Sequence, residues 1–175
     1  MDLRLELITS NNFEYALKVQ NTIFKEYNAR NNYLDSFKNS LLDFYLVYDS
    51  NICVGVTGIY AYKDDIDNAW IGFFGILEEY REKGYGKEAL RLTEEVAKKE
   101  NYKYIRLFTD KLNNDIAINF YKANGYSFED YNCNLEYLKD SFNVVIGSKT
   151  LIDKPAPKWD NKFLNITKQT SKQEY

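Results

Sequence analysis

In the stretch Arg81-Glu82-Lys83-Gly84-Tyr85-Gly86-Lys87, two glycines stand between a strongly apolar segment, residues 69–76, and a segment with helical spacing of apolar side chains, residues 87–99. Glycine adopts positive φ without steric cost and lets a ligand approach the backbone closely. The first turn of a helix also offers N–H groups without intrahelical acceptors, at the positive end of the helix dipole. The stretch therefore predicts one of two structures. One is an anion site suited to phosphate or pyrophosphate, and the other is a tight strand-to-helix turn with a solvated, charged surface.

The patterns on both sides of this stretch predict a mixed α/β chain. Before it we expect a strand at 3–7, a helix at 13–27, a helical piece at 34–42, a hairpin of 44–48 with 52–62, and a strand at 69–76. After it we expect a helix at 87–99, a strand at 104–108, a short helix at 116–123 that ends at Gly125, and strands near 126–131 and 142–147. This order predicts a sheet that is antiparallel in its first half, with one parallel crossover through helix 87–99.

The composition excludes several kinds of chemistry. The 175 residues include no His, which removes Ser-His-Asp and Cys-His relays and every His-containing zinc site. Cys53 and Cys133 are far apart, so we expect neither a disulfide framework nor a Cys-only metal cluster, and we interpret both as buried small residues. Catalysis would then depend on carboxylates, Tyr, Lys, backbone dipoles or a cofactor, with no metal.

Charge and hydropathy narrow the expected partners. The net charge is -3, from 23 basic and 26 acidic residues, without the basic excess that is typical of nucleic-acid binders. No apolar stretch approaches the ~20 residues of a membrane span. The first residues also lack the apolar run of a signal peptide. We therefore expect a cytoplasmic protein that binds neither nucleic acid nor membrane.

Two motifs in this order and at this spacing resemble those of the Gcn5-related N-acetyltransferases (GNAT), a family that depends on acyl-CoA. The stretch that contains Gly84 and Gly86 matches the pattern Arg/Gln-x-x-Gly-x-Gly/Ala. The second motif, Asn114-x-x-Ala117-x-x-Phe120-Tyr121-x-x-x-Gly125-Tyr126, is similar to the family's helix that ends in Gly-Phe or Gly-Tyr. The resemblance implies an α/β fold of the α+β type. It would have a mixed, mostly antiparallel sheet of roughly six to seven strands, helices on both faces and a splay between strands four and five. We expect this domain to span residues 1–151, and residues 152–175 to form an arm packed on the body or on a partner.

The resemblance also implies roles for individual residues. Tyr121 matches the family's usual general acid, which protonates the departing thiolate of acetyl-CoA, the co-substrate. Asn114 would contact the cofactor near its pantetheine arm. Backbone groups would hold the rest, and one strand N–H would polarise the thioester carbonyl. The residues concerned are Phe74, Gly75 and Ile76 for the pantetheine arm, and Arg81, Glu82, Lys83, Gly84, Tyr85, Gly86 and Lys87 for the pyrophosphate.

Several candidate residues keep a structural alternative. No carboxylate lies in the strand at 69–76, so Asp110, at the end of the next strand, is our candidate for the general base, with a turn residue as the alternative. Trp70, Phe73 and Phe74 either line an acceptor pocket or belong to an aromatic core. Tyr121 has the same alternative, since the chain contains 16 Tyr and 11 Phe.

The function that the resemblance implies is direct transfer of an acetyl group from acetyl-CoA to a primary amine of a small molecule or peptide, without an acyl-enzyme. A homodimer is compatible with the family. One alternative keeps the fold without catalysis, as an acyl-CoA-binding sensor or a partner-binding module. Another is dinucleotide binding, because residues 84–89 match G-x-G-x-x-G/A and Asp110 follows as a ribose acid. Against it, a charged segment separates Gly84 from the preceding strand, and two adjacent strands come earlier.

Overall fold

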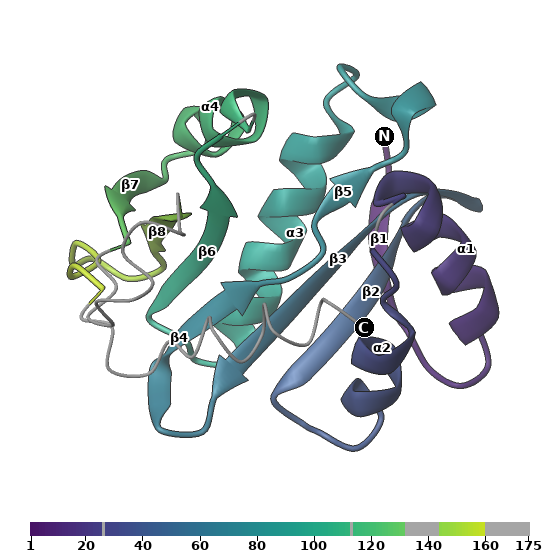
Figure 1. Ribbon diagram of the computed structural model, residues 1–175, viewed down its shortest axis with the longest axis horizontal. Helices are drawn as coiled ribbons and strands as arrows, with labels where there is room; N and C mark the ends of the chain where they lie inside the picture. Colours follow the sequence, from purple (N-terminus) through teal and green to yellow (C-terminus); the bar gives the residue numbers. More distant parts are fainter. Residues whose placement is uncertain (26, 113, 132–143, 160–175) are drawn as a thin grey trace. The chain divides into compact units, whose positions relative to one another are not determined.

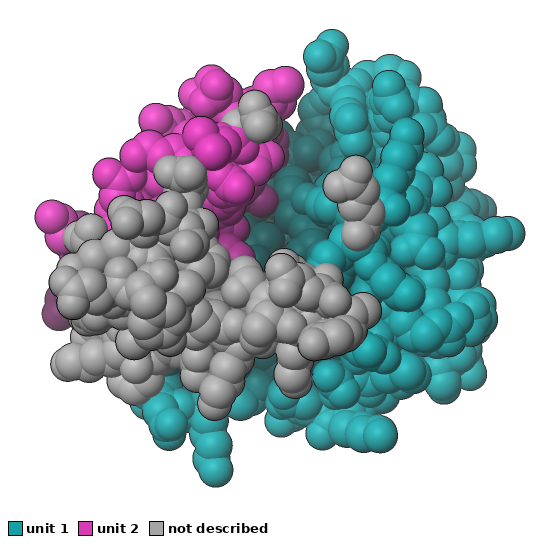
Figure 2. Space-filling view, viewed as in Figure 1, with its two compact units in different colours: residues 1–102 teal, residues 103–175 magenta. Residues whose placement is uncertain are grey.

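The structure is a computed structural model that describes residues 1–25, 27–112, 114–131 and 144–159. The chain divides into two units, residues 1–102 and residues 103–175, which Figure 2 colours separately. The described residues form eight strands and four α-helices, and the strand pairings within each unit are antiparallel (Figure 1). This is the mixed α/β class that the sequence predicted. It has one strand more than we expected, since residues 69–76 contribute to two strands instead of one.

In the first unit, β3 is the central strand of the sheet. It pairs with β2 on one side and with β4 and β5 on the other, and β1 completes the sheet beside β2. The predicted hairpin of β2 and β3 is confirmed. The elements of this unit are β1 (Leu3–Leu7), α1 (Phe13–Ile23), α2 (Arg30–Ser36), β2 (Leu42–Asp49), β3 (Ile52–Tyr62), β4 (Asp65–Ile71), β5 (Gly75–Ile76), the 3-10 helix η1 (Glu78–Tyr80) and α3 (Tyr85–Lys99).

Helix α2 ends before most of the helix predicted at 34–42, so that prediction was wrong for its second half. The chain turns at Asn39, whose side-chain oxygen accepts a hydrogen bond from the Leu41 N–H at 3.0 Å. Its carbonyl accepts a second one from the Leu42 N–H at 3.1 Å. An Asn side chain that bonds to nearby backbone competes with helix formation, and β2 therefore begins at Leu42.

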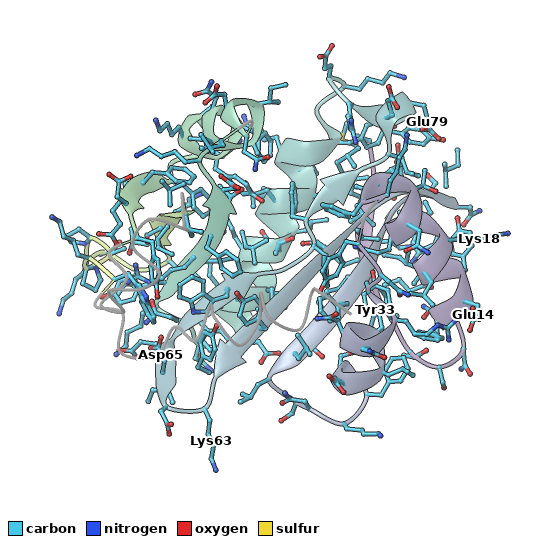
Figure 3. The ribbon with its side chains drawn as sticks, in the orientation of Figure 1. Glu14, Lys18, Tyr33, Lys63, Asp65 and Glu79 are labelled. Atoms are coloured by element: carbon cyan, nitrogen blue, oxygen red, sulfur yellow. The ribbon has the colours of Figure 1, made fainter. Side chains whose placement is uncertain are left out.

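Helices cover both faces of this sheet because neighbouring strand residues point to opposite sides. Leu46 packs with the cluster beneath α1 and α2, whereas Val47 packs with the cluster that includes α3. Tyr33 of α2 points into the first cluster and is fully buried. Glu14 and Lys18, on α1, point outward (Figure 3).

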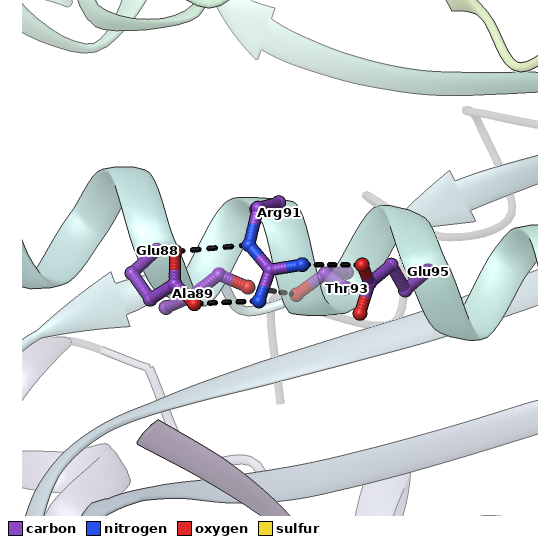
Figure 4. Close-up of polar contacts among 5 residues, drawn as sticks. All are labelled: Glu88, Ala89, Arg91, Thr93 and Glu95. Carbon is purple, nitrogen blue, oxygen red and sulfur yellow. Dashed lines mark hydrogen bonds and ion pairs between the residues drawn. The ribbon is translucent and has the colours of Figure 1, made fainter. Parts of the chain in front are cut away.

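A buried pair of hydroxyls ties α3 to β3. The Thr93 hydroxyl donates to the Ala89 carbonyl at 2.8 Å, so the Thr57 hydroxyl, 2.9 Å away, donates to Thr93. On the exposed side of α3, Arg91 forms ion pairs with one glutamate on either side (Figure 4). Exposed pairs of this kind contribute only about 0.2–1 kcal/mol. We therefore infer that the buried hydroxyl pair contributes more to the position of α3 against the sheet than the exposed ion pairs do.

The second unit contains three strands and one helix among its described residues. Strand β8 lies between β6 and β7 and pairs with both. The elements are β6 (Tyr104–Asp110), α4 (Asp115–Ala123), β7 (Ser127–Asp130) and β8 (Val144–Thr150). Across the described parts of both units, no helix is long and apolar enough to cross a membrane.

Part of the predicted C-terminal arm is fastened to these strands. The buried guanidinium of Arg106 donates to the Pro157 carbonyl at 2.9 Å and lies 5.4 Å from the Trp159 ring centroid. The Trp159 N–H donates to the Glu129 carboxylate at 2.6 Å. Residues 160–175 and Cys133 lie outside the described residues. The domain boundary at residue 151 stays a prediction.

Candidate functional site

A β-bulge interrupts the single strand that we predicted at 69–76. The Gly72 N–H still donates to the Gly58 carbonyl of β3 at 2.9 Å, and pairing resumes at Gly75. Phe73 and Phe74 therefore lie opposite a single residue of β3. Phe73 has a φ of 50°, a left-handed conformation that is uncommon for an aromatic residue. A bulge of this kind re-aims side chains and backbone groups at the point where it occurs.

The bulge sends its two aromatic side chains to different clusters. Phe73 packs among the rings beneath α1 and α2, with centroid distances of 4.9 Å to Tyr27 and 6.4 Å to Tyr33. Phe74 packs with the cluster on the α3 side. Trp70 is fully buried. Of the three aromatics considered for an acceptor pocket, Trp70 is a core residue, whereas Phe73 and Phe74 are each half-buried against a cluster.

Strand β5 directs a set of backbone groups away from β3. The Leu77 N–H donates to a β3 carbonyl at 2.9 Å, so by the alternation of an antiparallel pair Ile76 directs its N–H and C=O to the other side. The Ile76 carbonyl accepts a hydrogen bond from Arg81 Nε at 2.9 Å. At Gly75 a Cβ would lie 2.5 Å from Ile23 Cγ2, so only glycine fits beneath α1. The backbone of residues 74–76, which we predicted to hold pantetheine, is thus held by β3, by the Arg81 side chain and by its close approach to α1.

The loop between η1 and α3 presents a run of backbone donors. The Arg81 N–H donates within η1 at 3.1 Å, and the next N–H with an acceptor is that of Glu88, which donates to the Gly84 carbonyl at 3.2 Å. Within residues 81–88, the six N–H groups of 82–87 form no hydrogen bond of good geometry to any residue that the structure describes. Left-handed φ values of 59° at Glu82 and 87° at Gly84 shape this loop. A cluster of unpaired N–H groups at the positive end of a 15-residue helix has the chemistry of an anion site.

The basic side chains of the loop have different roles. The Arg81 backbone N–H donates to the Glu78 carbonyl, and Arg81 Nε donates to the Ile76 carbonyl. Arg81 therefore holds the loop against β5. Lys83 Nζ donates to the Glu79 carbonyl at 2.7 Å and lies 6.0 Å from the Tyr80 ring centroid. Lys87 is exposed and forms no ion pair with any described residue. The donors that remain for a ligand therefore include the N–H groups of 82–87, the Lys87 ammonium group and the Arg81 Nη groups, which form no hydrogen bond to a described residue.

In the second unit, Asn114 is the N-cap residue of α4 and Tyr121 lies within the helix. The Asn114 carbonyl accepts the Ile118 N–H at 2.9 Å, and its half-buried side-chain amide forms no hydrogen bond to a described residue. Tyr121 is buried between the rings of Phe120 and Tyr126, with centroid distances of 5.2 Å to each. Burial raises the pKa of the Tyr121 hydroxyl well above its ordinary value, so this group is protonated at neutral pH.

The end of α4 explains the Gly-Tyr pair of the second motif. Gly125 has a φ of 90°, and its N–H donates to the Lys122 carbonyl at 3.1 Å. The Tyr126 N–H donates to the Tyr121 carbonyl at 3.1 Å, which completes a Schellman motif. The prediction that Gly125 ends this helix is confirmed. The motif holds Tyr121 by its backbone and packs the Tyr126 ring against it.

Comparison with known proteins follows from these two motifs. The sequence model of the acetyltransferase (GNAT) family matches residues 9–126. The chain belongs to the GNAT acetyltransferase family. Among curated protein sequences, none matches the chain closely enough to count as a relative.

Solved structures with the GNAT fold cover most of the chain. The PaiA N-acetyltransferase of Thermoplasma acidophilum, in complex with coenzyme A, has a TM-score of 0.66 and 18% identity, covering 86% of this chain and 99% of its own. Ard1 of Thermoplasma volcanium has a TM-score of 0.68 and 21% identity, covering 87% and 100%. A GNAT acetyltransferase of Elizabethkingia anophelis with acetyl-CoA bound has a TM-score of 0.62 and 15% identity, covering 86% and 99%. At these identities the likeness shows the fold.

Two other residues of this GNAT chain bear on the predictions. Asp110 is exposed at the end of β6, and its carboxylate accepts the Leu112 N–H at 2.7 Å, a contact typical of a turn. Cys53 is buried, as predicted, and burial raises the pKa of its thiol. Among the described residues, no group of three or more His, Cys, Asp or Glu side chains is placed to hold a metal ion. Because the chain belongs to the GNAT family, we no longer keep dinucleotide binding as an alternative.

Sequence reasoning missed the bulge and the contacts that brace the glycine loop. The flanking Gly72 and Gly75 were the available signal for the bulge, because glycine inside a strand often marks one. The bond from Arg81 Nε to a carbonyl gave no signal, since any exposed Arg reads as a solvated charge. Both features lie at the site itself.

Proposed function

We propose that this protein transfers an acetyl group from acetyl-CoA to the primary amine of a small molecule or peptide. Membership of an acetyltransferase family supports acetyl transfer in general. The single observation that carries the proposal is the run of N–H groups without acceptors at residues 82–87, at the start of α3. These donors match the chemistry of a pyrophosphate, the group by which a nucleotide-linked thioester is most easily recognised.

The remaining contacts to acetyl-CoA would come from two further places. The backbone of residues 74–76 would bond the amides of the pantetheine arm, which is supported by the outward-directed N–H of Ile76. The side-chain amide of Asn114 has no partner among the described residues and would contact the cofactor near the same arm. When bound, acetyl-CoA supplies an activated acyl carbon with a thiolate leaving group.

Tyr121 is the proposed general acid. The amine nitrogen forms a bond to the acetyl carbon, the carbon–sulfur bond breaks, and the sulfur takes the hydroxyl proton of Tyr121. In water a thiol has a pKa near ~8.5 and a phenol near ~10, so bulk acidity does not drive this transfer. Burial, which raises the pKa of Tyr121, also raises the basicity of a thiolate formed in the same surroundings. The hydroxyl thus keeps its proton until the thiolate appears.

The test of this proposal is release of the CoA thiol from acetyl-CoA with a panel of amines, for the wild type and Tyr121→Phe. We expect kcat to fall about 10²-fold in Tyr121→Phe, with the KM for acetyl-CoA within about twofold, because only a proton donor is removed. Tyr104→Phe is a matched control, since its hydroxyl forms no hydrogen bond to a described residue. Equal kcat for Tyr121→Phe and wild type would remove Tyr121 from the mechanism. Binding of acetyl-CoA without turnover of any amine would favour the non-catalytic module.

Asp110 is the proposed general base for the proton of the attacking ammonium. One carboxylate oxygen accepts the Leu112 N–H, and the other has no partner among the described residues. Asp110→Asn keeps the acceptor for Leu112, so we expect an unchanged melting temperature. We expect kcat to fall about tenfold or more at neutral pH, because the amide accepts no proton. A kcat within twofold of wild type would assign Asp110 to the turn alone and leave deprotonation to solvent.

A further inference from the structure

A carboxylate at the end of β2 connects the glycine loop to the first strand of the chain. The Tyr85 hydroxyl donates to Asp49 Oδ2 at 2.8 Å, and the backbone N–H of Asp2 donates to Asp49 Oδ1 at 2.9 Å. The Ser50 N–H also donates to the Asp2 carbonyl at 3.2 Å. We name the contact of Asp2, Asp49 and Tyr85 the Asp49 bridge. All three residues lie in the first unit, and none belongs to the motifs by which the family is recognised, apart from the variable position that Tyr85 fills.

The electrostatics of the bridge keep it formed at neutral pH. The hydrogen bonds from Asp2 and Tyr85 hold the pKa of the Asp49 carboxyl below its usual range, and the bond to Asp49 raises the pKa of the Tyr85 hydroxyl. Asp49 is therefore an anionic acceptor while Tyr85 is a protonated donor. Hydrogen bonds with one charged partner are stronger than those between neutral groups.

The bridge acts on the residue that begins α3. Tyr85 is the first residue of the helix and follows Gly84, and its own N–H is one of the six without an acceptor. The loop before it contains Gly84, and glycine leaves the backbone more conformational freedom to lose when a ligand orders it. Fixing the Tyr85 side chain to β2 orders the first turn in advance.

We propose that the Asp49 bridge is a positioning element that presents the N–H donors of residues 82–87 to the pyrophosphate of acetyl-CoA. This inference rests on the proposed function. Asp49 and the Tyr85 hydroxyl do not touch the ligand, and they act through the backbone of the first turn of α3. Pre-organisation of this kind strengthens binding by lowering the ordering cost, without adding a contact.

Tyr85→Phe removes the hydroxyl and keeps the ring. That ring packs edge to face on Tyr80, with centroids 5.7 Å apart, and belongs to the α3-side cluster. The variant therefore isolates the hydrogen bond from the packing. Tyr80→Phe is the matched control, because the Tyr80 hydroxyl forms no hydrogen bond to a described residue and its ring lies in the same cluster.

The experiment is a double-mutant cycle with Tyr85→Phe and Asp49→Ala, read as the calorimetric Kd for acetyl-CoA. We expect Kd to rise about three- to tenfold in each single variant, which is the scale of the net contribution of one ordinary hydrogen bond, because the variants change only the ordering cost of the loop. The double variant should bind no more weakly than Asp49→Ala, since both changes break the same bond. Asp49→Asn retains an acceptor oxygen and should recover part of the affinity, and Tyr80→Phe should match wild type.

A second substrate separates positioning from a general loss of structure. S-acetylpantetheine carries the thioester and the arm but no pyrophosphate, so its turnover bypasses the donors that the bridge presents. Tyr85→Phe should raise the KM for acetyl-CoA. It should leave the kcat with either substrate, and the KM for S-acetylpantetheine, within about twofold of wild type. A merely structural role would change the KM for both substrates.

The outcomes separate the bridge from the proposed function. Wild-type protein that binds no acetyl-CoA would overturn both. Wild-type protein that binds acetyl-CoA while Tyr85→Phe binds it equally well would overturn the bridge alone. Additive losses in the double variant would show that Tyr85 and Asp49 act separately, which also contradicts the bridge.

Discussion

Gly84 and Gly125 adopt nearly the same left-handed backbone, with φ values of 87° and 90°, at opposite ends of two helices. Gly84 precedes α3, and the N–H groups of residues 82–87 form no hydrogen bond of good geometry within the described part of the chain. Gly125 follows α4, and the hydrogen bonds at this end satisfy the carbonyls of Tyr121 and Lys122. Around Gly84 the backbone N–H donors lack partners in the described chain, whereas around Gly125 the backbone carbonyl acceptors are hydrogen-bonded.

The difference shows that a glycine motif has no function by itself. What matters is which helix end it occupies and whether the backbone groups around it find partners within the chain. At Gly84 we propose that the open donors bind the pyrophosphate, in which case the glycine acts on affinity. At Gly125 the closed carbonyls fix the position of Tyr121, so the glycine acts on stability and on the placement of a side chain.

Gly84→Val should give the largest effect on this comparison. A Cβ at residue 84 would meet only Met1 Cε, at 3.6 Å, so the strain at this atom comes from the left-handed φ and not from crowding. A non-glycine residue in this conformation costs roughly 1–2 kcal/mol, which corresponds to about a five- to thirtyfold rise in the Kd for acetyl-CoA if the loop leaves its shape. Calorimetric titration measures it. A variant that folds and binds acetyl-CoA as wild type does would separate the loop geometry from binding.

Gly125→Ala should give a smaller effect of a different kind. Alanine at a φ of 90° costs about 1 kcal/mol in folding free energy, or roughly 2–4 °C in melting temperature for a chain of this size. The Kd for acetyl-CoA should stay within about twofold, while kcat falls if Tyr121 shifts. Thermal unfolding and steady-state kinetics on one preparation check both parts. A tighter or weaker Kd with an unchanged melting temperature would reverse the roles assigned to the two glycines.

The sequence predicted the parts of this site that depend on local chemistry. The hairpin of β2 and β3, the helix that follows Gly84 and the end of α4 at Gly125 all have short-range signals, and all three are confirmed, although α3 begins at Tyr85, two residues before the predicted start, and includes Gly86. The bulge at Phe73 and Phe74 was missed because residues 69–76 are apolar throughout. In such a run, one extra residue does not disturb any alternation. The position of α2 was missed because the turn at Asn39 depends on a side-chain bond to the backbone.

Two side-chain contacts around the site had no signal in the sequence. The Asp49 bridge joins residues 36 positions apart, and the bond from Arg81 Nε to the Ile76 carbonyl uses a side chain that reads as a surface charge. Each depends on how β2, β5 and α3 come together in the first unit. Such contacts can be found only after the fold is known, and they determine how firmly the donor run is held.

The most direct measurement is calorimetric titration of the wild-type protein with acetyl-CoA, with NAD and ATP titrated under the same conditions. If the N–H groups of 82–87 bind the pyrophosphate of an acyl-CoA, acetyl-CoA binds with a micromolar Kd and the two other nucleotides bind far more weakly. No binding of acetyl-CoA, or tighter binding of NAD, would contradict the account and leave the loop at Gly84 as a structural turn.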